Sequence, residues 1–389
     1  MNRRPARVSH LAMPPLLLLA LFATACHHAP PDGFDAQLPE HVEAVTGRSP
    51  LEVLEEGAAA LDPTARARAL AHLIAHDAAY APRALGDPSS WVQRAAVAAV
   101  GARGDSAAEL LALVGRTSAD PFVRALAALE AGSAAAEPSR LAQADAAEPW
   151  QVAPLALAAL VLGDETARDA LSAALQTGEL ALEVDLFFEI GRTDDAALLP
   201  ALEQAQRRVE AELVLPVATA RMMLGDASAE QAFRKAVTGS DVEARLEALD
   251  YLTRLYTPEA NALLRRARTQ GPELVTWYAN LALAARAGTD PELFGRALRD
   301  TDREVRVLAV RFSREAASGG PANRRVAKAA RKAVLDALAD RDSTVRIEAL
   351  RAVAALDLPE ARQVVEALVD DERPLVRIEA AGTVLQLTR

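Results

Sequence analysis

The sequence repeats about every thirty residues, and this period constrains the fold more than any other feature. Equivalent positions recur 27 to 32 residues apart, with one longer step of 40. These positions, called index residues below, are Ala65, Val92, Val123, Val152, Val184, Leu213, Ala244, Leu274, Val305, Val345 and Val376. A period near thirty residues fits one pair of helices per repeat, and stacked helix pairs form an α-solenoid.

Three other residue types recur at fixed distances from the index residue. Alanine stands four places after it in eight repeats, where a small side chain lets helices approach closely. Aspartate stands three places before it at Asp62, Asp120, Asp241, Asp302 and Asp342, where a carboxylate can cap the helix that follows. Arginine stands one place after it at Arg66, Arg124, Arg245, Arg306, Arg346 and Arg377. The pattern predicts an all-α fold, a superhelical solenoid of about eleven helix pairs over residues 43–389.

The order of aspartate, a Val-Arg pair and then alanine resembles the HEAT-repeat family, in particular its short bacterial type. The resemblance is carried by Asp120 with Val123-Arg124, Asp302 with Val305-Arg306, and Asp342 with Val345-Arg346. It implies that these aspartates and arginines connect one repeat to the next. We therefore expect them to be structural rather than catalytic.

Residues 1–25 have the features of an export signal, because three arginines precede an apolar run that ends in small residues. Ala23-Thr24-Ala25-Cys26 resembles the lipobox of bacterial lipoproteins. This resemblance implies that Cys26 is lipidated and anchors the protein in the cell envelope. The expected location is the outer membrane, with the protein facing the periplasm. The alternative is an ordinary signal peptide that leaves a free thiol. Residues 26–42 contain proline, glycine and histidine without periodicity, which predicts a flexible tether.

The charge of the chain excludes some partners and indicates others. With 43 basic and 54 acidic residues, the net charge of −11 argues against nucleic-acid binding. A local exception is the basic run formed by Arg324, Arg325, Lys328, Arg331 and Lys332. This run could meet an anionic protein or lipid head group, or it could be the solvated face of a helix.

Residues suited to catalysis are few. His72 and His76 are four places apart and share a helix face, but the sequence indicates no third metal ligand. A histidine near a helix C-terminus is also stabilised by the helix dipole without a metal. There is no glycine-rich phosphate loop, and no cofactor is indicated. Trp277 and Tyr278 could anchor a partner or fill space between repeats.

These observations predict a membrane-anchored, non-enzymatic scaffold or adaptor. Other envelope proteins would bind along its curved surface, because stacked repeats create an extended concave face. Two alternatives stay open. One is an enzyme or metal-dependent protein that uses His72 and His76, and the other is a protein that binds a small ligand or cell-wall polymer in the groove.

Overall fold

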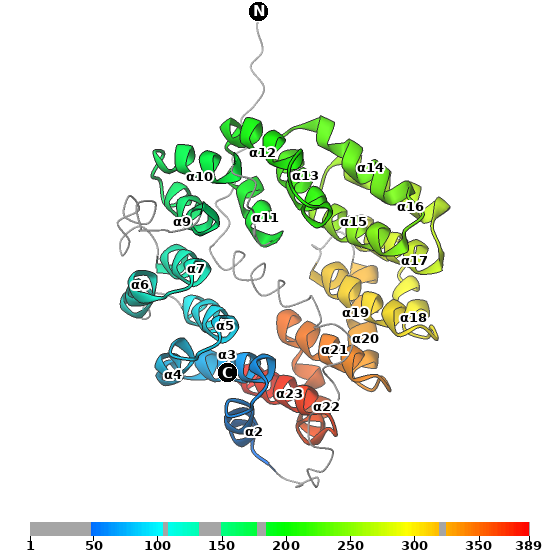
Figure 1. The fold of residues 1–389 in the computed structure, drawn as a ribbon. Coiled ribbons are helices and arrows are strands. Elements are labelled where there is room, and N and C mark those ends of the chain that lie inside the picture. Colours follow the sequence, from blue (N-terminus) through cyan, green and yellow to red (C-terminus); the bar gives the residue numbers. More distant parts are fainter. Residues whose placement is uncertain (1–47, 104–107, 132–148, 177–183, 319–323, 389) are drawn as a thin grey trace, which may run out of the picture.

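The computed structural model describes residues 48–103, 108–131, 149–176, 184–318 and 324–388. These residues form 21 α-helices, joined by loops and short 3-10 turns, and include no strand. Figure 1 shows the helices arranged in an inner and an outer layer that together follow a closed ring. The prediction of an all-α solenoid is confirmed.

Inner and outer helices alternate along the chain. The inner layer consists of α3 (Pro63–His76), α5 (Ser90–Gly101), α7 (Pro121–Ala131), α9 (Pro149–Val161), α11 (Val184–Arg192), α13 (Val214–Met223), α15 (Val242–Arg254), α17 (Glu273–Ala287), α19 (Arg303–Ser318), α21 (Ser343–Leu356) and α23 (Pro374–Leu387). The outer layer consists of α2 (Pro50–Gly57), α4 (Ala81–Leu85), α6 (Ala108–Thr117), α10 (Ala167–Gln176), α12 (Leu199–Gln206), α14 (Glu230–Thr238), α16 (Pro258–Gln270), α18 (Leu293–Ala297), α20 (Arg324–Ala337) and α22 (Arg362–Ala367). Ten of the eleven index residues lie in the first turn of an inner helix, and Leu213 lies in the 3-10 turn that leads into α13.

The aspartates before the index residues start the inner helices. Asp62 accepts hydrogen bonds from the backbone amides of Thr64 and Ala65 at 3.1 and 3.0 Å. Asp342 accepts one from Thr344 at 2.8 Å. Asp120, Asp241 and Asp302 do the same at the starts of α7, α15 and α19. Each carboxylate satisfies first-turn amides that have no partner within the helix.

The alanines four places after the index residues lie where the layers pack. All eight are buried: Ala69, Ala96, Ala127, Ala156, Ala248, Ala309, Ala349 and Ala380. Three repeats carry a larger residue at this position, and Phe188, Val217 and Tyr278 are buried as well. The apolar interior is divided into several clusters along the ring, as expected when each repeat packs on its neighbours.

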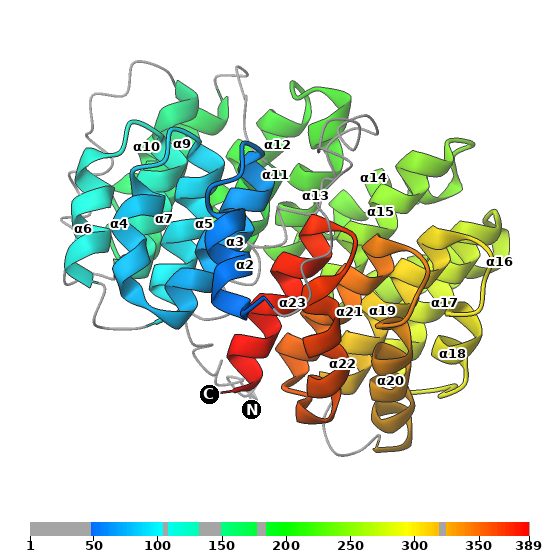
Figure 2. The same cartoon turned by 90° about the horizontal axis from the view of Figure 1, so that it is seen from below.

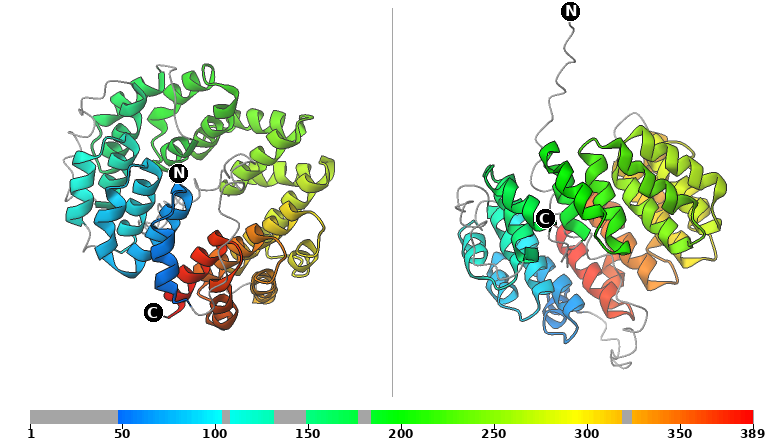
Figure 3. Two further views of the ribbon diagram at one scale, coloured as in Figure 1. Left: turned by 60° about the horizontal axis from the view of Figure 1, so that its bottom comes forward. Right: turned by 45° about the horizontal axis from the view of Figure 1, so that its top comes forward.

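The ring closes because the first described helices pack against the last. α2 contacts both α3 and α23, and α23 also contacts α3. α2 thus takes the outer-layer place that follows α22, and the three helices lie side by side in Figure 2. The views in Figure 3 show the same junction between the blue and red ends of the ring.

The junction is tightly packed and continuous with the apolar interior. Gly57 lies so close to α3 and α23 that a Cβ atom there would be 2.8 Å from Cδ1 of Ile378 and 2.9 Å from Cβ of Ala69. One apolar cluster contains residues of α2 to α7 together with residues of α19 to α23. The closure was not predicted from the sequence.

The predicted signal peptide (1–25), lipidated Cys26 and tether (26–42) lie outside the described residues. In the part of the chain that is described, no helix has the length and apolar character needed to cross a membrane.

Candidate functional site: charged residues of the inner layer

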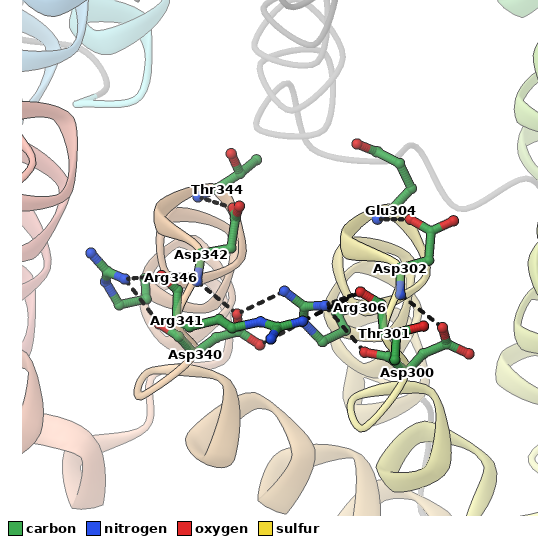
Figure 4. A network of polar contacts seen from close by, with 10 residues as sticks. All are labelled: Asp300, Thr301, Asp302, Glu304, Arg306, Asp340, Arg341, Asp342, Thr344 and Arg346. Atoms are coloured by element: carbon green, nitrogen blue, oxygen red, sulfur yellow. Dashed lines mark hydrogen bonds and ion pairs between the residues drawn. The ribbon is translucent and has the colours of Figure 1, made fainter.

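The arginines after the index residues bind the loop of the next repeat. Arg306 Nε lies 2.9 Å from Oδ2 of Asp340, and its Nη1 donates to the carbonyls of Asp300 and Thr301 at 3.1 Å (Figure 4). Arg346 pairs with Asp371 at 2.9 Å in the same way. The arginines therefore bridge consecutive repeats.

The partner of each bridging arginine differs from the capping aspartate. Asp340 stands two residues before the cap Asp342, and its carboxylate accepts hydrogen bonds from the side chain of Arg306 and from the backbone amide of Asp342. Arg66 likewise pairs with Asp87 at 3.1 Å rather than with Asp62. In the repeat of Val345, Asp342 thus caps the helix while Asp340 binds the arginine of the preceding repeat.

Two other arginines of the predicted ladder bind backbone carbonyls. Arg245 donates to Gly239 and Gln270 at 2.6 and 3.2 Å. Arg377 donates to the carbonyls of Asp371 and Glu372 at 2.9 and 3.2 Å. Arg124 lies in α7.

A second set of charged residues lies on the inner-layer helices. We call this set the inner belt: Arg68 and His72 of α3, Asp250 and Arg254 of α15, Arg311, Arg314 and Glu315 of α19, Glu348 and Arg351 of α21, and Glu379 of α23. Most of these side chains are partly exposed, whereas their helical neighbours on the opposite side are buried.

The ring junction contains a buried carboxylate that faces two arginines and a histidine. Glu379 is 5% exposed, and its oxygens lie 3.2 Å from Nη1 of Arg68, 3.2 Å from Nε2 of His72 and 3.1 Å from Nη2 of Arg351. Arg351 also binds Glu348 at 2.6 Å. Burial opposes ionisation of Glu379, but Arg351 and its other cationic neighbours outweigh burial and hold its pKa well below the usual range.

A similar arrangement surrounds Asp250. Its carboxylate binds Arg311 at 2.6 Å and Arg254 at 3.0 Å, and accepts a hydrogen bond from the Tyr278 hydroxyl at 3.0 Å. Burial disfavours the charged form, yet Arg311 and Arg254 lower the pKa of Asp250 to about 2. Because Arg311 lies on α19, this contact reaches past α17 and connects three inner helices.

The two predicted metal-ligand candidates are not brought together with a third ligand. His72 faces Glu379, whereas His76 is exposed in the last turn of α3. Among the described residues, no group of three or more His, Cys, Asp or Glu side chains is placed to hold a metal ion.

The predicted partner-binding residues are distributed over both layers. Tyr278 is buried and packs edge-on against Phe312, with ring centroids 5.3 Å apart, and Trp277 is half-buried against the same apolar cluster. The basic run is exposed on the outer helix α20, at Arg324, Arg325, Lys328, Arg331 and Lys332. Of these, Lys332 pairs with Asp336 at 2.5 Å.

A pocket of about 530 Å³ lies between the inner helices α7, α9 and α11. Phe122, Leu157 and Leu186 contribute apolar walls. Glu189 and Arg192, which form an ion pair at 3.3 Å, contribute charge at one side.

The inner belt was missed by the sequence analysis, although a signal for it exists. Charged residues stand three places after the index residue at Arg68, Glu348 and Glu379, and six places after it at Asp250, Arg311 and Arg351. These spacings put them on one helix face. The pairing of Arg68 with Glu379 across the ring junction depends on closure.

Comparison with known proteins finds structural similarity only at low sequence identity and low TM-score. The chain matches no known family profile and no curated protein. Among solved structures, two engineered proteins are each 20% identical to it. One covers 88% of this chain and 100% of its own at a TM-score of 0.25. The other covers 72% and 96% at 0.26. Human deoxyhypusine hydroxylase in complex with glycerol is 17% identical, covers 73% and 97%, and has a TM-score of 0.32. Similarity at these levels supports no statement about function.

Proposed function

We propose that this chain is a HEAT-like lipoprotein of the bacterial cell envelope that acts as a non-enzymatic scaffold or adaptor. The lipobox resemblance at Cys26 supports anchoring. The proposed location is the outer membrane, with the protein facing the periplasm. Two lipid chains or one chain with a second signal are needed for stable anchoring, and lipoprotein acylation supplies more than one chain. The aspartates and arginines of the repeat pattern engage in caps and bridges, which favours a structural role over a catalytic one.

The observation that carries the scaffold proposal is the exposed basic surface of α20. Five cationic side chains share this outer helix on a chain whose net charge is −11. One of them, Lys332, is paired with Asp336, and both members of that pair are largely exposed. Such a surface favours a partner of opposite charge, because complementary charge speeds encounter and selects among partners. We infer that α20 binds an acidic surface of another envelope protein.

Charge reversal on α20 tests this surface. In cells, the full chain carrying Lys328→Glu and Arg331→Glu should lose the cross-linked partners that the wild type captures. The matched control is Arg265→Glu with Arg268→Glu, which reverses two exposed arginines on the outer helix α16. Equal capture by the α20 variant and the wild type would contradict the proposal.

Replacement of Cys26 tests the anchor separately. Cys26→Ser removes the acceptor for lipid, so the protein should move from the membrane fraction to the soluble fraction of lysed cells. An unmodified thiol on membrane-free wild-type protein would contradict anchoring and leave the α20 test unaffected.

The pocket between α7, α9 and α11 supports a second candidate, the binding of a small amphipathic ligand. A pocket of about 530 Å³ with apolar walls and a few charged groups falls in the range of ligand sites. Val161 lines this pocket and is 47% exposed, so Val161→Trp should fill it without disturbing the interior. Fluorescence of anilinonaphthalene sulfonate should rise with the wild type and not with the variant. Equal fluorescence with both would contradict this candidate.

A further inference from the structure

The pocket between α7, α9 and α11 combines apolar walls with a charged end. Phe122 and Leu129 of α7 and Leu157 and Leu160 of α9 contribute apolar walls. The charged residues come from α11, from the first turn of α10 and from the loops that follow α9 and α11. An apolar cavity with charge at one end suits an amphipathic molecule.

Both arginines that line the pocket are already bound to carboxylates. Nε of Arg168 lies 2.5 Å from Oδ2 of Asp195. Nη1 of Arg192 lies 3.3 Å from Oε1 of Glu189, which is 7% exposed. These two ion pairs compensate the positive charge of the pocket.

Two further carboxylates line the pocket, and no arginine or lysine of the described chain forms an ion pair with them. Glu165 lies in the loop after α9 and Asp194 in the loop after α11, and both are exposed. Arg168, which Glu165 attracts from beyond contact distance, is the partner of Asp195. The described lining residues thus include four carboxylates and two guanidinium groups, which gives a net charge of −2.

The combination of walls and charge favours one kind of head group. Apolar walls have a low dielectric constant and concentrate the field of the carboxylates, which raises the local concentration of cations. An ammonium group has three N–H donors for carboxylate oxygens, which accept only, whereas an anionic head group would be repelled.

We propose that the pocket binds a small amphipathic amine, with its apolar part between α7 and α9 and its ammonium group beside Glu165 and Asp194. This inference rests on the pocket as a ligand site, the second candidate function, and adds the charge of the ligand. The basic surface of α20 has no part in it.

Displacement of the neutral fluorophore N-phenyl-1-naphthylamine from the full chain at low ionic strength tests the head group. The competitors are octylamine, octanol and octanoate, which share eight carbon atoms and differ in charge, since an aliphatic amine is protonated at neutral pH. We expect octylamine to displace the fluorophore at about fivefold to tenfold lower concentration than octanol, and octanoate to require more than octanol. Val161→Trp, which fills the pocket, identifies any signal that arises elsewhere.

Removal of the two carboxylate charges tests their role. Glu165→Gln with Asp194→Asn should bind the fluorophore like wild type and show about equal displacement by octylamine and octanol. Asparagine tolerates the left-handed backbone of Asp194, where φ is 57°, so the loop should keep its conformation. The matched control is Glu360→Gln with Asp370→Asn, which removes the same charge from exposed positions on either side of α22, outside the pocket. This control should keep the wild-type preference for octylamine.

The outcomes separate the amine from the pocket itself. If neither the fluorophore nor any competitor binds, the pocket is not a ligand site and both proposals fail. If the fluorophore binds and octanoate displaces it as well as octylamine does, the amine proposal alone is overturned. The same holds if Glu165→Gln with Asp194→Asn keeps the full preference for octylamine, or if the α22 control loses it equally.

Discussion

The cost of removing a single charge from this fold depends on how deeply its partners are buried. The pair of Arg362 and Glu366 lies at the surface of α22 with both side chains about half exposed, and such pairs contribute little. Glu379 is buried and contacts two arginines and a histidine from α3 and α21. Removing its charge takes away the anion that faces two arginines and a histidine in a place with little water.

We predict that Glu379→Gln lowers the free energy of unfolding by about 3 kcal/mol or more. Glu366→Gln, which removes one charge from an exposed pair, should change it by about 1 kcal/mol or less. Urea unfolding at neutral pH followed by circular dichroism measures both. Similar small effects for the two variants would show that the cluster at the ring junction contributes no more than a surface pair.

Glu130 of α7 makes the stability of the protein fall as pH rises, because burial raises the pKa of its carboxyl group from 4.5 to about 7. The folded state then binds a proton that the unfolded state has released, so this contribution to stability is complete below pH 4.5 and lost as pH rises to about 7. When the pH is raised across this interval, the free energy of unfolding of Glu130→Gln should increase by about 2 to 3 kcal/mol relative to that of wild type. Unfolding measured at pH 4.5 and 7.5 checks this, and a pH-independent difference would contradict it.

At the scale of helices, the sequence predicts the register of the solenoid but not its closure. Index residues and capping aspartates identify the start of nearly every inner helix, because both depend only on local spacing. Closure depends on small rotations that accumulate over all repeats, and no local pattern encodes their sum. The bridging aspartates Asp340 and Asp371 were also not predicted, because each pairs with an arginine of the preceding repeat and this contact is not visible in the spacing within one repeat.

The packing of α23 against α3 can be tested at Gly382. A glycine in the middle of a helix usually gains up to about 1 kcal/mol of stability when replaced by alanine. A Cβ atom at Gly382, however, would overlap the imidazole ring of His72 on α3. We predict that Gly382→Ala instead destabilises the protein by about 1 to 3 kcal/mol.

The matched control is Gly295→Ala in α18, where a Cβ atom would meet nothing closer than Nη1 of Arg299 at 3.8 Å. This variant should be as stable as wild type or more stable. Adding His72→Ala to Gly382→Ala should recover part of the loss, because the overlap disappears. If Gly382→Ala stabilises the protein as Gly295→Ala does, the two ends of the ring do not meet as described.

For the whole molecule, closure changes how stability is distributed. In an open solenoid, the first and last repeats have one neighbour each, so they unfold locally more often than the middle. In the closed ring, α3 has α5 and α23 as neighbours, and α2 completes the outer layer beside α23. The helices α3 and α23 are therefore not the ends of an open stack.

Hydrogen exchange should reveal this difference. We predict that amides of α3 and α23 exchange about as slowly as those of α19 and α21 in the wild type, because all four helices have neighbours on both sides. In Gly382→Ala, exchange should accelerate first in α2, α3 and α23, since loss of the junction turns these helices into the ends of an open stack. Fast exchange at α3 and α23 already in the wild type would mean that the ring is open in solution. The cations Arg68 and Arg351 would then lose their shared carboxylate, and the charged belt of the inner layer would end at α21 and α23 instead of continuing to α3.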